Sequence, residues 1–89
     1  MKAISVEVVT PEKIIFKGTA LSIVLPAVSG EMGVLPGHAP LITILKQGDI
    51  RLEKEEGKET FAVKGGFAEV GPEMVKVFIE GLARAGQKT

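Results

Sequence analysis

The chain has 89 residues, eleven basic and eleven acidic side chains, and a hydrophobic content of 45%. This size suits one domain with one modest core, and zero net charge argues against binding a phosphate backbone. The absence of cysteine excludes disulfides and thiol nucleophiles, and a single histidine makes a catalytic or metal cluster hard to assemble. Without a signal peptide or an apolar run near ~20 residues, we expect a soluble cytoplasmic chain.

In chain order, the sequence is a succession of short apolar segments with a period of two. Ile4, Val6 and Val8, for example, alternate with polar residues, which is typical of a strand with one buried face. The predicted strands are residues 4–8, 14–16, 21–25, 41–45, 50–53, 60–64, 67–70 and 74–79. Residues 41–45 are apolar at nearly every position, so we expect this strand to be covered on both faces.

Turn signals separate these segments every eight to ten residues. They include a polar hairpin turn at residues 55–58, a glycine pair at 65–66 and a turn at 71–73. No segment before residue 80 has a helical period, although residues 83–85 could begin a helix. The pattern predicts an all-β fold: an antiparallel sandwich or flattened barrel of eight or nine short strands.

Residues 30–40 differ from the rest of the chain. Three glycines and two prolines predict a rigid loop, yet it contains hydrophobic residues that a solvated loop would not normally have. From Gly18 through Leu45 the only charged residue is Glu31. Such a stretch fits a surface that a partner covers, and it equally fits a buried apolar crossover between strands. In the first case, Glu31 would pair with a basic group on the partner.

His38 offers the one route to catalysis in this stretch. As a general base it would need a nucleophile, and Ser29 and Thr43 are the nearby hydroxyls. A hydrolase of this kind is one alternative, but no orienting carboxylate is evident in the sequence. We expect no catalytic residue, no metal site and no cofactor.

Two segments partly match phosphate-binding loops. Residues 30–33 have a Gly-x-x-Gly spacing, but they lack the basic residues that a nucleic-acid clamp requires. Residues 81–89 nearly match a P-loop, but Gln87 separates Gly86 from Lys88 and breaks the required order. We therefore expect neither nucleic acid nor nucleotide as a partner of these segments.

The unusual stretch closely resembles the signature of the epsilon subunit of F-type ATP synthases. The matching residues are Gly30-Glu31-Met32-Gly33-Val34-Leu35-Pro36-Gly37-His38-Ala39-Pro40-Leu41. Supporting similarities lie at residues 8–12, 65–70 and 75–77, so the resemblance runs in order from about residue 4 to residue 80. It implies a β-sandwich of about ten short strands.

The resemblance also implies a function. Members of the family are non-catalytic central-stalk subunits of proton- or sodium-translocating ATP synthases, peripheral on the cytoplasmic face of the membrane. They link the gamma subunit to the membrane c-ring, and by resemblance Glu31 would face the basic loop of a c subunit, with His38 near gamma. The implied partner-binding residues are Gly30, Glu31, Met32, Gly33, Val34, Leu35 and His38.

The chain departs from the family after the last predicted strand. Family members usually continue into a two-helix hairpin, which binds ATP in some bacteria and can inhibit hydrolysis, whereas this sequence stops at Thr89. We expect a β-sandwich domain at residues 1–80 and a short stub at 81–89 where the hairpin would begin. Without the hairpin we expect no nucleotide binding and no direct membrane insertion. The alternative to a rotor subunit is a free-standing small β-domain that binds a small ligand in the mouth of the sandwich.

Overall fold

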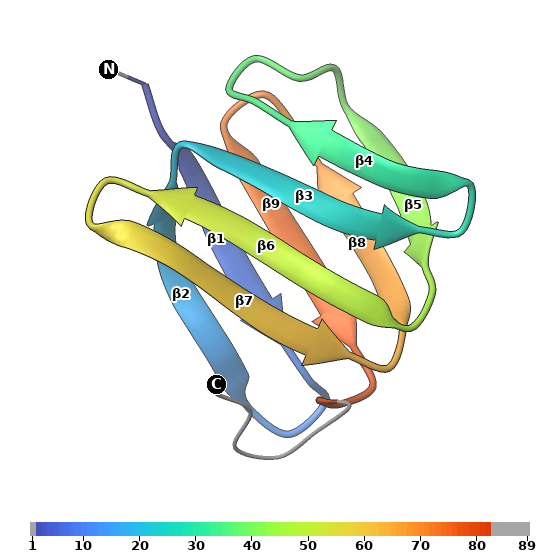
Figure 1. The fold of residues 1–89 in the computed structure, drawn as a ribbon. Helices are drawn as coiled ribbons and strands as arrows, with labels where there is room; N and C mark the ends of the chain where they lie inside the picture. The colour runs from blue at the N-terminus through green and yellow to red at the C-terminus, as the bar shows by residue number, and fades with distance from the viewer. Residues whose placement is uncertain (1, 83–89) are drawn as a thin grey trace.

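The structure is a computed structural model that describes residues 2–82 (Figure 1). Within this range the chain forms nine strands and no helix, so it has no helix that could cross a membrane. The strands are β1 (Ile4–Val9), β2 (Ile14–Ala20), β3 (Ser22–Ala27), β4 (Gly30–Val34), β5 (Leu41–Leu45), β6 (Gly48–Lys54), β7 (Gly57–Val63), β8 (Gly66–Val70) and β9 (Met74–Ile79). The all-β prediction is confirmed.

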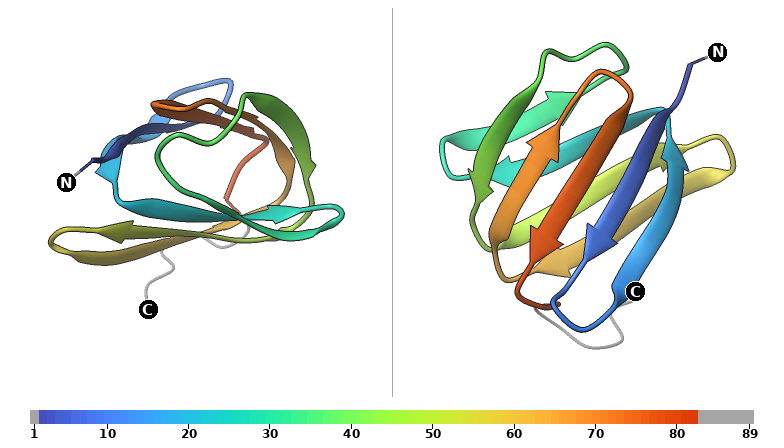
Figure 2. Two further views of the ribbon diagram at one scale, coloured as in Figure 1. Left: turned by 90° about the horizontal axis from the view of Figure 1, so that it is seen from above. Right: turned by 180° about the vertical axis from the view of Figure 1, so that it is seen from behind.

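The strands form one curled sheet that folds over into two layers. Its hydrogen-bonded order is β2-β1-β9-β8-β5-β3-β6-β7, with β4 added beside β3. Figure 2 shows β2, β1, β9, β8 and β5 in one layer and β7, β6, β3 and β4 in the other. The layers join where β5 meets β3, through the single register pair Ala27 and Leu45. All pairings are antiparallel except that of β1 with β9, which is parallel.

The core lies between the two layers and is built from the inward half of each strand. The largest fully buried side chains are Ile4, Val6, Val8, Ile23, Leu25, Val34, Ile50, Leu52, Val63, Val75 and Val77. Burying a side chain of this size contributes roughly 1.5–3 kcal/mol. No polar or charged side chain in residues 2–82 is buried. In β1, β6 and β9 the period-two alternation predicted correctly which positions face the core.

The glycine pair at residues 65–66 makes the expected bend. Gly65 and Gly66 have φ angles of +132° and +145°, which other residues rarely adopt. A Cβ on Gly66 would lie 2.0 Å from the carbonyl oxygen of Phe78. Glycine is required here because β8 starts in direct contact with the backbone of β9.

Two local predictions were wrong. Residues 30–34, expected in a loop, form strand β4, which pairs with β3 through a tight turn at Val28 and Ser29. Strand β5, expected to be covered on both faces, is covered on one: Ile42 and Ile44 are 67% and 57% exposed. The expected helix start at residues 83–85 lies outside the described residues, and the division into 1–80 and 81–89 stays a prediction.

Candidate functional site

The segment that carries the family resemblance is divided between a strand and a loop. After β4, residues 35–40 lie against the turn between β8 and β9, where the Gly37 amide donates to the carbonyl oxygen of Pro72 at 2.8 Å. The ring of His38 contacts the carbonyl oxygen of Ala39, at 2.7 Å from Nδ1. Because a carbonyl oxygen only accepts, this bond requires the proton on Nδ1. The bond to Pro72 thus ties the loop to the turn between β8 and β9, whereas the bond of His38 lies within the loop.

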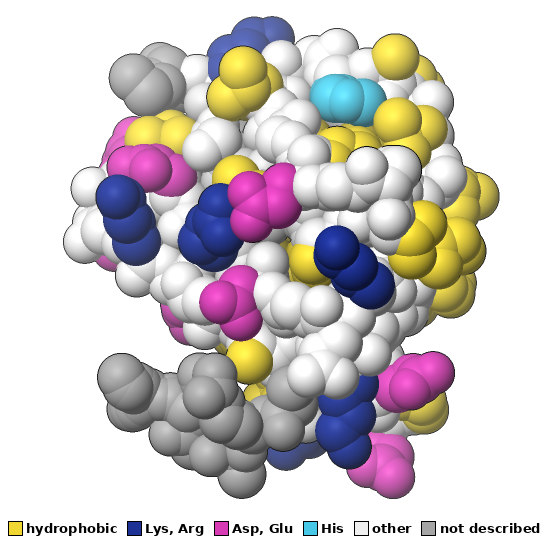
Figure 3. All heavy atoms as spheres, turned by 45° about the vertical axis from the view of Figure 1, so that its right-hand side comes forward, with side chains coloured by type: hydrophobic (Ala, Val, Ile, Leu, Met, Phe, Trp, Pro, Cys, Tyr) yellow, Lys and Arg dark blue, Asp and Glu magenta, His cyan; other side chains and the backbone are white. Residues whose placement is uncertain are grey.

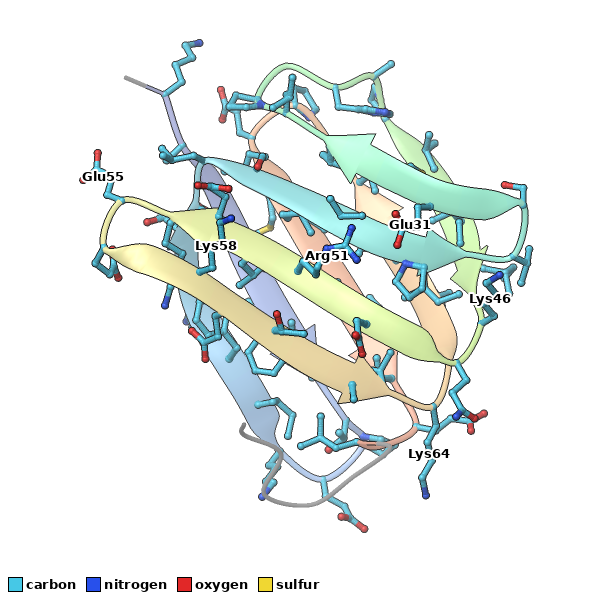
Figure 4. All side chains as sticks on the ribbon, viewed as in Figure 1. Glu31, Lys46, Arg51, Glu55, Lys58 and Lys64 are labelled. Atoms are coloured by element: carbon cyan, nitrogen blue, oxygen red, sulfur yellow. The ribbon has the colours of Figure 1, made fainter. Side chains whose placement is uncertain are left out.

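Glu31 lies on the outer surface of β4 and has a partner within the chain. Arg51 of β6 donates from Nη1 to Oε2 at 3.0 Å and from Nη2 to Oε1 at 3.2 Å. Figure 4 shows the two side chains pointing toward one another, with β3 lying between β4 and β6. These hydrogen bonds lower the pKa of Glu31 and raise the pKa of Arg51. Glu31 is isolated in the sequence but paired in the fold.

The seven predicted partner-binding residues do not share one surface. Glu31, Gly33 and Leu35 are exposed, whereas Gly30, Met32 and His38 are half-buried. The side chain of Val34 is fully buried in the core. Because strand side chains alternate between faces, β4 directs its odd positions outward and its even positions inward. Val34 is therefore a core residue, and a direct contact with a partner is open only to the outward members of the set.

An apolar outer surface that sequence reasoning did not identify lies beside this segment. We call it the apolar face and define it as Val28, Ile42, Ile44, Phe67 and Phe78. Its parts are adjacent: the amide of Val28 donates to Ile44, Ile44 is opposite Phe67, and the rings of Phe67 and Phe78 stack at 4.7 Å. Figure 3 shows hydrophobic side chains gathered along this side of the molecule. The signal for it in the sequence is the uncharged run at residues 41–45, for which the prediction of burial on both faces is wrong.

The apolar face continues into a groove of about 460 Å³ beside the first residues of β8 and the last residues of β9. Its lining residues are Val9, Thr10, Pro11, Gly66, Phe67, Phe78, Ile79 and Glu80. The hydroxyl of Thr10, one of its few polar groups, already accepts bonds from the amides of Glu12 and Lys13. A small-ligand site normally combines an apolar cavity with several convergent polar groups, and this groove offers few.

The geometry around His38 gives no support to a hydrolase. The hydrogen bond of its ring goes to the neighbouring carbonyl, not to the hydroxyl of Ser29 or Thr43. Ser29 lies in the turn before β4, and Thr43 lies on β5. Over residues 2–82, no three His, Cys, Asp or Glu side chains lie close enough together to hold a metal ion.

Comparison with known proteins identifies relatives over almost the whole chain. Residues 3–85 match the family model of the ATP synthase delta/epsilon chain β-sandwich domain. The ATP synthase epsilon chain of Gloeothece citriformis is 45% identical over 85 residues, and that of Chromohalobacter salexigens is 43% identical over 86. Each alignment covers 96% of this chain and 61% of the relative, so the chain spans less than two thirds of their length.

Solved structures show the same fold. A cryo-EM structure of Euglena gracilis mitochondrial ATP synthase, comprising OSCP, F1 and c-ring, contains a chain with a TM-score of 0.84 and 27% identity. The match covers 91% of this chain and 52% of that one. A chain in the Tetrahymena thermophila central stalk and c-ring has a TM-score of 0.74 at 14% identity, covering 100% and 77% of the two chains. The present chain belongs to the family of ATP synthase delta/epsilon chain β-sandwich domains, and its curated relatives are epsilon chains.

Proposed function

We propose that this chain is the β-sandwich part of a central-stalk rotor subunit, which links the gamma subunit to the c-ring of an F-type ATP synthase. In this role it has no active site and works by transmitting torque between its two partners. It would sit peripherally, on the cytoplasmic side of the membrane, within a complex that translocates protons or sodium ions. Family membership and the likeness to chains from F1/c-ring and central-stalk assemblies support this role.

The observation that carries the proposal is the apolar face on β5, β8 and β9. Ile42 and Ile44 are 67% and 57% exposed, so these two large apolar side chains are not part of the core. Contiguous apolar surface on a soluble domain marks a site that a protein partner covers. The interiors of protein interfaces are enriched in aromatic residues, as this face is through Phe67 and Phe78, and Glu69, opposite Ile42, adds a charge at its edge. We assign it to gamma, and the family resemblance implies that His38 also lies near gamma.

A subunit that links gamma to the c-ring must contact the c-ring through a different surface. We assign that contact to the outward-facing side chains in the segment 30–38. Glu31, Gly33 and Leu35 are exposed there, beside the loop that Pro72 fixes. A carboxylate on a rigid strand suits a basic group of a c subunit, because such a pair fixes register and orientation. Gly30, Met32, Val34 and His38 would support this surface through their backbone and packing.

The test is titration of the chain into a complex of gamma and c-ring that lacks epsilon, with binding and coupled ATP hydrolysis as readouts. Ile44→Asp should reduce binding at least tenfold, because it places a charge in an apolar interface. The matched control is Ile14→Asp: Ile14 is 56% exposed and lies on β2, four strands from β5. The control should bind normally, and both variants should melt like the wild type.

Equal binding by Ile44→Asp would contradict the assignment of gamma to this face. Absence of wild-type binding would contradict the rotor role and direct attention to ligands of the groove.

A further inference from the structure

The pair formed by Arg51 and Glu31 has a geometry that few surface ion pairs have. Two hydrogen bonds, at 3.0 and 3.2 Å, join both guanidinium Nη atoms to both carboxylate oxygens. Exposed ion pairs contribute little as a rule, and bidentate Arg–carboxylate pairs are the exception because they fix the plane of both groups. The carboxylate of Glu31 is therefore held in one orientation before any partner arrives.

The sheet register shows how the pair spans three strands. Val24 of β3 lies opposite both Arg51 on β6 and Gly33 on β4. Glu31 lies opposite Pro26, two residues further along β3. Arg51 must therefore extend across β3 to reach Glu31. Gly33, the next outward position of β4, has no side chain, and a Cβ built there meets no atom within 4 Å. Glu31 is thus open to approach from the side of the loop at residues 35–40.

We propose, on the basis of the rotor function proposed above, that Arg51 is a positioning residue for the contact between Glu31 and a basic group of the c-ring. A carboxylate has about four lone-pair sites, and Arg51 occupies one on each oxygen. The side chain of Glu31 remains 62% exposed, so a second cation can approach the carboxylate. Arg51 holds one side of the carboxylate and the partner takes the other.

The charges of the pair indicate which step of binding Arg51 affects. Arg51 and Glu31 have opposite charges 3.0 Å apart, so the pair as a whole is neutral. A neutral pair exerts little long-range attraction on a basic partner. Recognition then depends on the oriented carboxylate at short range, which governs the rate of dissociation.

The experiment measures association and dissociation rates of the whole chain with the gamma–c-ring complex. In Arg51→Gln the carboxylate is free to rotate, and we expect dissociation to accelerate about tenfold. The charge of Glu31 is unmasked at the same time, so association should be unchanged or a few-fold faster. Arg51→Lys keeps the positive charge but cannot form two hydrogen bonds in one plane. Its dissociation rate should lie between those of the wild type and Arg51→Gln. In a Glu31→Gln background, Arg51→Gln should change dissociation no further.

A double variant, Glu31→Arg with Arg51→Glu, separates positioning from a merely structural role. It keeps an ion pair between β4 and β6 but presents a cation outward, so we expect binding to the c-ring complex to be lost while the melting temperature is retained. Binding equal to wild type would overturn the inference, as would an unchanged dissociation rate in Arg51→Gln. A wild-type chain that fails to bind would overturn the rotor function and this inference with it, whereas normal wild-type binding with silent Arg51 variants would overturn the inference alone.

Discussion

The two outer surfaces of the sandwich enclose the same core but differ in chemistry. On β5 and β8 the outward side chains are mostly apolar: Ile42, Ile44 and Phe67 are exposed there, with one charged residue, Glu69, opposite Ile42. On β6 and β7 they include Arg51, Glu53 and Lys58, with Glu53 directly opposite Lys58 in the register. Charged side chains are well hydrated. Exposed apolar side chains are hydrated at a cost in free energy, which is relieved when a binding partner buries them. The inward residues of each strand thus determine the fold, and the outward residues indicate what the fold meets.

This comparison predicts that inward and outward substitutions of equal chemistry have very different effects. Val77 of β9 is fully buried, so Val77→Asp places a charge in the core without a partner. We expect a loss of about 4 kcal/mol or more, which is enough to unfold a domain of this size. Circular dichroism during urea and thermal unfolding measures the effect, and the outward Ile44→Asp serves as the reference. A melting curve of Val77→Asp that matches the wild type would refute the placement of β9.

A smaller effect should distinguish two glycines on opposite layers. Gly66→Ala forces a Cβ to within 2.0 Å of the Phe78 carbonyl oxygen, at a φ of +145°. We expect a loss on the order of 2–3 kcal/mol in the free energy of unfolding.

Gly33→Ala is the matched control for this change, because its Cβ meets nothing within 4 Å and its φ is not in the left-handed region. It should alter the free energy of unfolding by less than about 1 kcal/mol. Urea denaturation of both variants under one condition provides the comparison. Equal stability of the two would show that β8 and β9 are not in close contact at Gly66.

The sequence predicted the alternating strands well, because buried Val and Ile at every second position leave few other interpretations. Strand β4 was missed although it alternates too: Met32 and Val34 face inward while Glu31 and Gly33 face outward. The glycines that leave its outer surface open were interpreted as loop residues. A sequence rule treats every glycine as evidence for a loop, because it has no information on which face of a sheet the glycine occupies.

The candidate site was only partly accessible from the sequence, for a different reason. The apolar run at residues 41–45 was recognised, but burial by the protein itself and burial by a partner produce the same composition. The pairing of Glu31 with Arg51 depends on the order β4-β3-β6, which brings together residues twenty positions apart. Strand order is a long-range property, so local patterning could not reveal that Glu31 has a partner within the chain.

The smallest expected effect concerns pH, and it tests whether the pair between Glu31 and Arg51 persists in solution. The pKa of Glu31 is lowered by the hydrogen bonds and charge of Arg51. A carboxyl whose pKa is lower in the folded state contributes stability above its unfolded pKa of about 4.3, and this contribution is lost as the pH falls through the folded pKa. The difference in unfolding free energy between wild type and Glu31→Gln should therefore be present at neutral pH and disappear in acid.

We expect this difference to be small, because both side chains are exposed and salt screens them. A carbon-detected NMR titration of the Glu31 carboxyl is the more sensitive measurement: in Arg51→Gln its pKa should rise toward the ordinary value. At about 1 M salt, where the Debye length is near 3 Å, the wild-type pKa should move in the same direction. The pKa of Glu31 should change less with salt in the wild type than in Arg51→Lys, because the two short hydrogen bonds from the guanidinium are screened less than a separated charge. A Glu31 pKa that ignores both the substitution and the salt would show that the pair does not form in solution, and Arg51 could then not orient the carboxylate for a partner.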